Sequence, residues 1–274
     1  MKIYRVLLSL IMLMGATLAC DLGKVQDTVK AVSKAVDLLQ EISESGTWKY
    51  TTEGIEALDK ANGFAAEATL TSGETTATGE SITQINRQVL WSISADAQGD
   101  SMLSITQSDT VLQYLTVDKK RYLVNADGTY SCDDTTDEAD IFAGNVGDLF
   151  VQYSADAIGV QAISVAEQQS TNESVNGFTT TKYRLVSKLQ DALDILKDVD
   201  SDDLKKSIAD VPPFFIDGTI YIDNATKALI RFEATYSDLD RKEGNTFIFN
   251  VTALGNQPDY TAPDPSKITK ACGS

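Results

Sequence analysis

The chain contains few residues that could carry out covalent chemistry. Among its 274 residues there is no histidine, and Ser-His-Asp and Cys-His catalysis both need an imidazole as the base. The common zinc enzyme sites need histidine ligands as well, so they are excluded too. We therefore expect no catalytic residues, no metal and no cofactor, and the protein is predicted not to be an enzyme. A pair of carboxylates that meet in the folded chain, as in a glycosidase, is the catalytic arrangement left open.

Two of the three cysteines, Cys132 and Cys272, are predicted to form a disulfide bond. An isolated pair is most simply a disulfide in an oxidising compartment, and two free thiols are the alternative. The bond would close a loop of about 140 residues, for which the chain-entropy model gives roughly 5 kcal/mol. No histidine or basic cluster stands near either thiol to lower its pKa, so catalysis by a free cysteine is not expected.

Clusters of acidic residues raise the question of cation binding. The aspartates between 198 and 203 supply hard oxygen ligands of the kind that calcium prefers. The calcium-binding loop needs glycine at its sixth position and glutamate at its twelfth, where this chain has Asp203 and Ala209. We therefore expect these acids to cap a helix and the acidic run at 133–140 to be a solvated loop.

The N-terminal residues point to a different chemistry, the covalent attachment of lipid. Lys2 and Arg5 precede an apolar run at 6–14, which is too short to span a bilayer and is predicted to be a processed signal. Residues 17–20, with the sequence TLAC, resemble the lipobox of bacterial lipoproteins. That resemblance implies cleavage before Cys20 and a lipid on its sulfur. The alternative is an ordinary secretory signal that is cleaved elsewhere, in which case Cys20 carries no lipid.

Removal of the signal peptide 1–19 would leave residues 20–274 as one predicted domain. The whole chain has 23 basic and 40 acidic residues and a net charge of −17. An acidic body repels phosphate backbones, so no nucleic acid is expected as a partner. It also repels anionic membrane surfaces, so membrane contact is expected only through the lipid on Cys20. The predicted location is the cell membrane, lipid-anchored and facing the extracytoplasmic side.

The first half of the chain is predicted to contain helices followed by strands. Apolar residues at three- and four-residue steps predict a helix from Asp21 to Ser45, and a second, shorter one is expected at 47–61. From Phe64 the period changes to two, and short strands joined by hairpin turns at 96–100, 108–109 and 118–120 predict an antiparallel meander. A further turn is predicted at 174–177. The segment 74–86, rich in Thr, Gly and Ser, is predicted to be a loop or a weak edge strand.

The second half mixes further helices and strands. Apolar residues at 141–153 predict a helix or a lid-like loop, and those at 191–209 predict a helix that two prolines end. A proline-rich extended tail at 257–265 leads to Cys272. Five further strands are predicted, at 163–168, 178–186, 218–223, 229–236 and 246–254.

The apolar faces of the strands are the remaining candidate site. They form either an ordinary core or the concave face of a curved sheet that holds an apolar ligand between sheet and helices. The alternation shows only which residues of one strand share a face. The apolar residues of the last three strands are therefore predicted as three separate groups. The candidate ligand-binding residues are Trp91, Ile93, Leu103, Ile105, Tyr183, Leu185, Ile220, Ile222, Ile230, Phe232, Phe247 and Phe249.

This order of elements is similar to that of the LolA/LppX-like lipoprotein carriers. The similarity rests on the lipobox at Cys20, the helix before the first strand, the short segments 175–185 and 256–258, and the hairpin at 218–232. It implies an α+β fold in which an antiparallel curved β-sheet forms an unclosed half-barrel, with helices covering the concave face. It also implies that lipids or lipidated molecules bind in the hydrophobic half-barrel.

We therefore expect a lipid-anchored extracytoplasmic binding protein that holds an apolar ligand, such as a lipid, glycolipid or lipidated molecule, and that could transfer it. Its expected partners are the membrane, through the lipid on Cys20, and the hydrophobic ligand. The alternative is a non-catalytic structural or interaction lipoprotein of the cell surface, whose core is filled.

Overall fold

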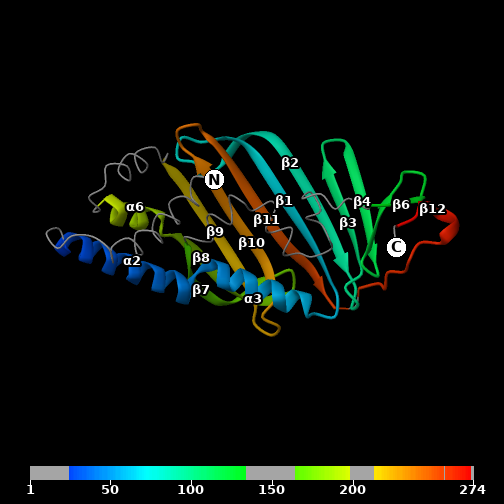
Figure 1. Ribbon diagram of the computed structural model, residues 1–274, viewed down its shortest axis with the longest axis horizontal. Helices are drawn as coiled ribbons and strands as arrows, with labels where there is room; N and C mark the ends of the chain where they lie inside the picture. Colours follow the sequence, from blue (N-terminus) through cyan, green and yellow to red (C-terminus); the bar gives the residue numbers. More distant parts are fainter. Residues whose placement is uncertain (1–24, 134–163, 198–212, 256, 273–274) are drawn as a thin grey trace.

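The computed structural model describes residues 25–133, 164–197, 213–255 and 257–272. Within these residues it contains twelve strands in one sheet and three α-helices (Figure 1). The strands are β1 Phe64–Thr75, β2 Ile82–Ala95, β3 Ser101–Gln107, β4 Thr110–Val117, β5 Lys120–Val124, β6 Tyr130–Cys132, β7 Ser164–Val175, β8 Phe178–Ser187, β9 Phe214–Asp223, β10 Leu229–Asp238, β11 Glu243–Leu254 and β12 Ile268–Lys270.

The sheet is open, and nearly all of it is antiparallel. Its strand order is β12-β6-β5-β4-β3-β2-β1-β11-β10-β9-β8-β7, so β12 and β7 form two separate edges (Figure 1). The short strand β12 runs parallel to β6, and the other neighbouring pairs are antiparallel. The predicted fold class, an α+β protein built on an unclosed antiparallel half-barrel, is confirmed.

Tight turns explain why neighbouring segments pair as hairpins. Asp118 and Lys119 connect β4 to β5 with φ of 51° and 64°, and Asn176 and Gly177 connect β7 to β8 with φ of 52° and 85°. Two successive residues with positive φ are typical of the two-residue type I′ turn, whose twist matches that of the strands it joins. The turns expected at both places are therefore present.

The strands are longer than the sequence suggested. The segment 74–86, predicted to be a loop or a weak edge strand, lies mostly in β1 and β2, which pair as far as Thr75 and Ile82 and leave only 76–81 as the connection. The strand alternative holds for 74–75 and 82–86 and the loop alternative for 76–81, because threonines favour a strand as readily as a loop once a partner lies alongside. For the same reason β7 continues through its polar residues to Val175, beyond the predicted end at 168.

Three helices lie against one side of the sheet. They are α2 Val25–Ser45, α3 Thr47–Asp59 and α6 Leu189–Lys197. The first two agree with the predicted helices over the described residues, and α6 begins two residues before the predicted start, while 198–209 lies outside the described residues. Helix α3 packs on β7, β9 and β10, and α2 packs on β7 and α6 (Figure 1).

The C-terminal tail is extended, as predicted, and returns to the sheet. The Ser94 hydroxyl donates to Oε1 of Gln257 at 3.1 Å, and the backbone N–H of Tyr260 donates to Oδ2 of Asp96 at 2.9 Å. Strand β12 then joins β6, and the predicted disulfide between Cys132 and Cys272 is confirmed, with 5.0 Å between the two Cα atoms. The tail thus ties the C-terminus to the β6 edge of the sheet.

Candidate apolar binding face

The strand register places the predicted site residues on one face of the sheet, except Ile230, which lies at the register shift between Leu229 and Arg231. Side chains directly opposite each other on neighbouring strands share a face, because successive residues of a strand alternate between faces. One cross-strand row runs from β8 to β3 through Tyr183, Ile220, Phe232, Phe249, Ala68, Trp91 and Ile105. We call the face that carries this row the apolar face.

Two further rows lie on the same apolar face, on either side of the first. The residues that the sequence grouped strand by strand are therefore parts of one continuous surface, because β9, β10 and β11 are neighbours in the sheet. One row contains Val251, Ala66, Ile93 and Leu103. The other contains Ala234, Phe247, Leu70 and Val89, next to Leu185 of β8.

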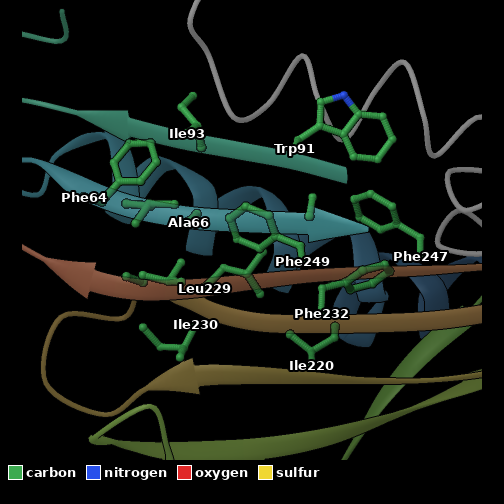
Figure 2. Close-up of a cluster of buried hydrophobic side chains, with 14 of the residues drawn as sticks. Phe64, Ala66, Trp91, Ile93, Ile220, Leu229, Ile230, Phe232, Phe247 and Phe249 are labelled. Atoms are coloured by element: carbon green, nitrogen blue, oxygen red, sulfur yellow. The ribbon is translucent and has the colours of Figure 1, made fainter. Parts of the chain in front are cut away.

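The apolar face is tightly packed. Phe232 and Phe249, which are opposite each other on β10 and β11, are both 0% exposed. Figure 2 shows the side chains of Trp91, Phe247 and Phe249 gathered with those of neighbouring strands in one cluster. Of the twelve candidates, Ile105 and Tyr183 are partly buried and pack against this cluster, and the others are buried within it.

The structure adds residues to this face that the sequence did not single out. Ala66 and Ala68 of β1 lie at its centre, between β11 and β2. They belong to the alternating run that begins at Phe64. Alanine side chains are small and only weakly hydrophobic, however, so the sequence alone did not indicate them as site residues. Leu229 is fully buried at a register shift in β10, where the regular alternation is interrupted.

Helix α3 covers the β7–β10 part of the apolar face. Its buried residues are Thr47, Thr51, Gly54 and Leu58, a narrow stripe of mostly small side chains. A Cβ atom on Gly54 would lie 2.9 Å from Cβ of Leu229, so the helix approaches β10 as closely as glycine allows. The rows of apolar side chains continue through β1, β2 and β3, beyond the strands that α3 contacts.

An aromatic contact holds the same helix to β8. The rings of Tyr50 on α3 and Tyr183 on β8 have their centroids 4.6 Å apart. Burial raises the pKa of the Tyr183 hydroxyl, and the nearby Tyr50 raises it further. The Tyr183 hydroxyl therefore stays neutral in the physiological range, which suits an apolar surrounding.

A separate, polar cleft of about 520 Å³ lies between α2 and α6, away from the apolar face. Beside it, Nζ of Lys188 contacts Oε1 of Glu41 at 2.8 Å and Oδ2 of Asp191 at 3.8 Å. The cleft contains none of the predicted site residues. It is lined by Lys34, Asp37, Leu38, Glu41, Asp191, Asp194 and Ile195.

Within residues 25–133, 164–197, 213–255 and 257–272, the Cys, Asp and Glu side chains form no group of three or more that could hold a metal ion. None of the helices there has the length and apolar character needed to cross a membrane. Cys20, the acidic run at 134–140, the apolar patch at 141–153 and the aspartates at 198–203 lie outside the described residues.

Comparisons with known proteins found likenesses in structure. A comparison with protein-family models found no match, and neither did one with curated protein sequences. Among solved structures, a LolA superfamily protein from Nitrosomonas europaea is 8% identical, covers 78% of this chain and 95% of its own, and has a TM-score of 0.28.

Two other solved structures match over a similar part of the chain. MucB of Pseudomonas aeruginosa, in complex with MucA, is 10% identical over 80% of this chain and 59% of its own, with a TM-score of 0.31. A DUF1329 family protein from Desulfovibrio piger is 9% identical over 79% and 95%, with a TM-score of 0.24. The fold class itself rests on the strand order of the sheet.

Proposed function

We propose that this protein is a lipid-anchored, extracytoplasmic binding protein that holds an apolar ligand against its apolar face. The ligand would be a lipid, a glycolipid or a lipidated molecule, and the lipid on Cys20 would keep the protein at the membrane. Transfer of the ligand to another acceptor would then need no chemistry from the protein.

The observation that carries this proposal is the continuous apolar face. Its rows of large side chains cross from β8 to β3, a span wider than the strands that α3 contacts. Ligand pockets are usually lined by apolar and aromatic side chains. An acyl chain is flexible and needs only apolar contact, so a surface of Phe, Trp, Ile and Leu side chains is suited to it.

Helix α3 is the element that would have to move for the ligand to reach the β7–β10 part of the apolar face. Its buried stripe consists mostly of small residues, so its separation from β9 and β10 costs less buried apolar area than that of a Leu-rich helix would. A bound acyl chain would replace the contacts that Leu58 and Tyr50 make with the sheet.

A second candidate function, a structural lipoprotein with a filled core, is favoured by one specific observation. Residues such as Phe232, Phe249 and Ile220 are 0% exposed in this state. A core that never opens would give the same burial. The two functions therefore differ in whether α3 leaves the sheet.

The experiment uses the chain with Cys20→Ser, so that the soluble protein carries no lipid of its own. We expect native mass spectrometry of protein from a bacterial host to show a bound lipid, and we expect the protein to take up a fluorescent phospholipid from vesicles. Protein that is consistently empty in both measurements would overturn the proposal in favour of the filled core.

A matched variant tests the movement of α3. Gly54→Cys with Leu229→Cys places two thiols where α3 meets β10. Their Cβ atoms would lie 2.9 Å apart, below the roughly 3.5–4.5 Å of a disulfide, so α3 must move slightly outward before the bond forms and locks it to the sheet. The locked form should take up less than a tenth of the phospholipid that the parent takes up, and reduction should restore uptake. Reduction also breaks the native Cys132–Cys272 disulfide, so phospholipid uptake by the parent protein under the same reducing conditions is the control.

A further inference from the structure

Strand β2 is longer than the strand next to it. Its pairing with β1 extends to Ile82, whereas its pairing with β3 ends at Val89 opposite Gln107. Residues 82–88 therefore extend past β3 with one side open, and we call them the free β2 edge. In Figure 1 this upper part of β2 runs away from the β3–β4 hairpin.

The backbone of the free β2 edge has unused hydrogen-bonding capacity. Residues 83–88 are all exposed, and within the described part of the chain they form no backbone hydrogen bond on the side away from β1. In an antiparallel strand every second residue directs its N–H and C=O to each side. These groups form a template that another strand can pair with.

Apolar side chains are exposed at the same place. Ile85 in the free β2 edge is 58% exposed, and Leu90, just beyond it, is 43% exposed. Leu90 lies in one cross-strand row with Thr106 and Val111, and Val111 is 57% exposed. This row is on the face opposite the apolar face, because Leu90 alternates with Trp91.

The other edges of the sheet are better protected than the free β2 edge. Strand β7 is polar, carries Glu167 and Glu173, and has two register shifts, while β12 has only three residues. Charges, irregularities and short length are the usual protection against unwanted strand pairing. The pairing of the free β2 edge with β1 also has two register shifts, but this edge contains no proline and only one charged residue, Arg87.

We propose that the free β2 edge binds an extended peptide segment of a partner protein by strand addition. Strand addition takes its affinity from backbone hydrogen bonds and its specificity from alternate side chains. A segment of seven residues, about 23 Å long, would match the edge. An apolar residue at the end of the peptide next to Gln107 would lie beside the row of Leu90 and Val111, and a carboxylate opposite Arg87 would form an opposite-charge cross-strand pair. Within the described residues Arg87 forms no ion pair.

The geometry favours a single strand over a second copy of this chain. The register shifts between Ser72 and Gly73 and between Glu74 and Thr75 add local twist to this end of β2. A flexible peptide can follow that twist, whereas a preformed sheet cannot.

The experiment is selection from a phage-displayed library of linear twelve-residue peptides, with the Cys20→Ser chain as target. We expect enriched peptides to carry an apolar residue near one end and an acidic residue. We expect N-methylation of alternate amides to weaken their binding at least tenfold, because it removes the ladder hydrogen bonds. Amide hydrogen exchange of residues 82–88 should slow when such a peptide is bound.

Matched variants at exposed positions keep the fold intact. Leu90→Asp with Val111→Asp should weaken peptide binding at least tenfold, whereas Val36→Asp, at an equally exposed apolar position on α2, should leave it unchanged. The proposal is overturned if no peptide is enriched, if binding survives N-methylation, if another edge is protected instead, or if the chain dimerises through residues 82–88. None of these outcomes depends on whether the apolar face binds lipid.

Discussion

Asp96 joins two distant parts of the chain through one buried carboxylate. Its Oδ1 accepts hydrogen bonds from the backbone N–H groups of Gln98 and Asp100, at 2.9 and 3.0 Å, and so shapes the turn between β2 and β3. Its Oδ2 accepts from the N–H of Tyr260 in the C-terminal tail at 2.9 Å. The same side chain therefore closes a hairpin and holds the tail.

We expect Asp96→Ala to lower the free energy of unfolding by about 2 kcal/mol, because it leaves backbone donors without their acceptor. Urea unfolding followed by circular dichroism measures this loss. The control is Asp127→Ala, which removes an exposed carboxylate that accepts from Thr129 in the turn before β6 and should cost clearly less. Equal losses for the two variants would show that the tie to the tail contributes nothing.

The sequence revealed only half of this residue's role. The run from Asp96 to Asp100 was predicted to be a hairpin connection, since Asp and Gly are typical of turns. The bond to Tyr260 could not be predicted, because nothing in the local pattern indicates which distant segment passes over the turn. The same holds for Gln257 and Ser94.

Helices α2 and α6 are held together by Lys188, at the start of α6. The hydrogen bond to Glu41 raises the pKa of the Lys188 ammonium, and the charges of Glu41 and Asp191 raise it further, while partial burial opposes the shift. A lysine whose pKa is raised in the folded state stabilises that state fully below its unfolded pKa of about 10. This stabilisation is lost as the pH rises through the folded pKa.

We expect Lys188→Met to reduce the free energy of unfolding by about 1 kcal/mol at neutral pH, since Glu41 is partly exposed. The difference from the parent should stay constant up to about pH 10 and shrink above it. Denaturant titrations at several pH values measure it. Lys197→Met, which breaks an exposed pair within α6, is the control and should have little effect; a difference that grew with pH would contradict the assignment.

At the scale of elements, the period of the sequence predicted most strands and both N-terminal helices, but not how they are arranged. Alternation in β9, β10 and β11 shows which residues share a face within each strand. It does not show that β11 lies between β1 and β10, which makes those faces one surface. The short hairpins could be predicted because their turn residues are local, and the β1–β11 pair could not.

The disulfide acts on the molecule as a whole. Cys132 and Cys272 are 140 residues apart in sequence, so the bond restricts a large loop of the unfolded chain. Replacement of both cysteines by serine should lower the free energy of unfolding by about 4–5 kcal/mol, measured by denaturant unfolding in the Cys20→Ser background. Hydrogen exchange should rise in β6 and β12 and stay unchanged in β1 and β11.

Reduction of the parent protein is the matched comparison for that variant, and it should produce the same loss. An unchanged unfolding midpoint in both would mean that the tail is held by Asp96 and β12 alone. The pairing of the two cysteines was predictable from their number and from the oxidising compartment that the N-terminal segment predicts, whereas the parallel β12–β6 pair beside them was not.

The position of β1 has a consequence for how the chain is made. Strand β1 is the first strand in sequence, yet its neighbours are β2, which follows at once, and β11, which comes near the end. A chain that emerges N-terminus first can form the β1–β6 meander early, but Ala66 and Ala68 have no Phe249 to pair with until most residues have been synthesised. The centre of the sheet thus assembles late, and until then β1 is exposed along one side.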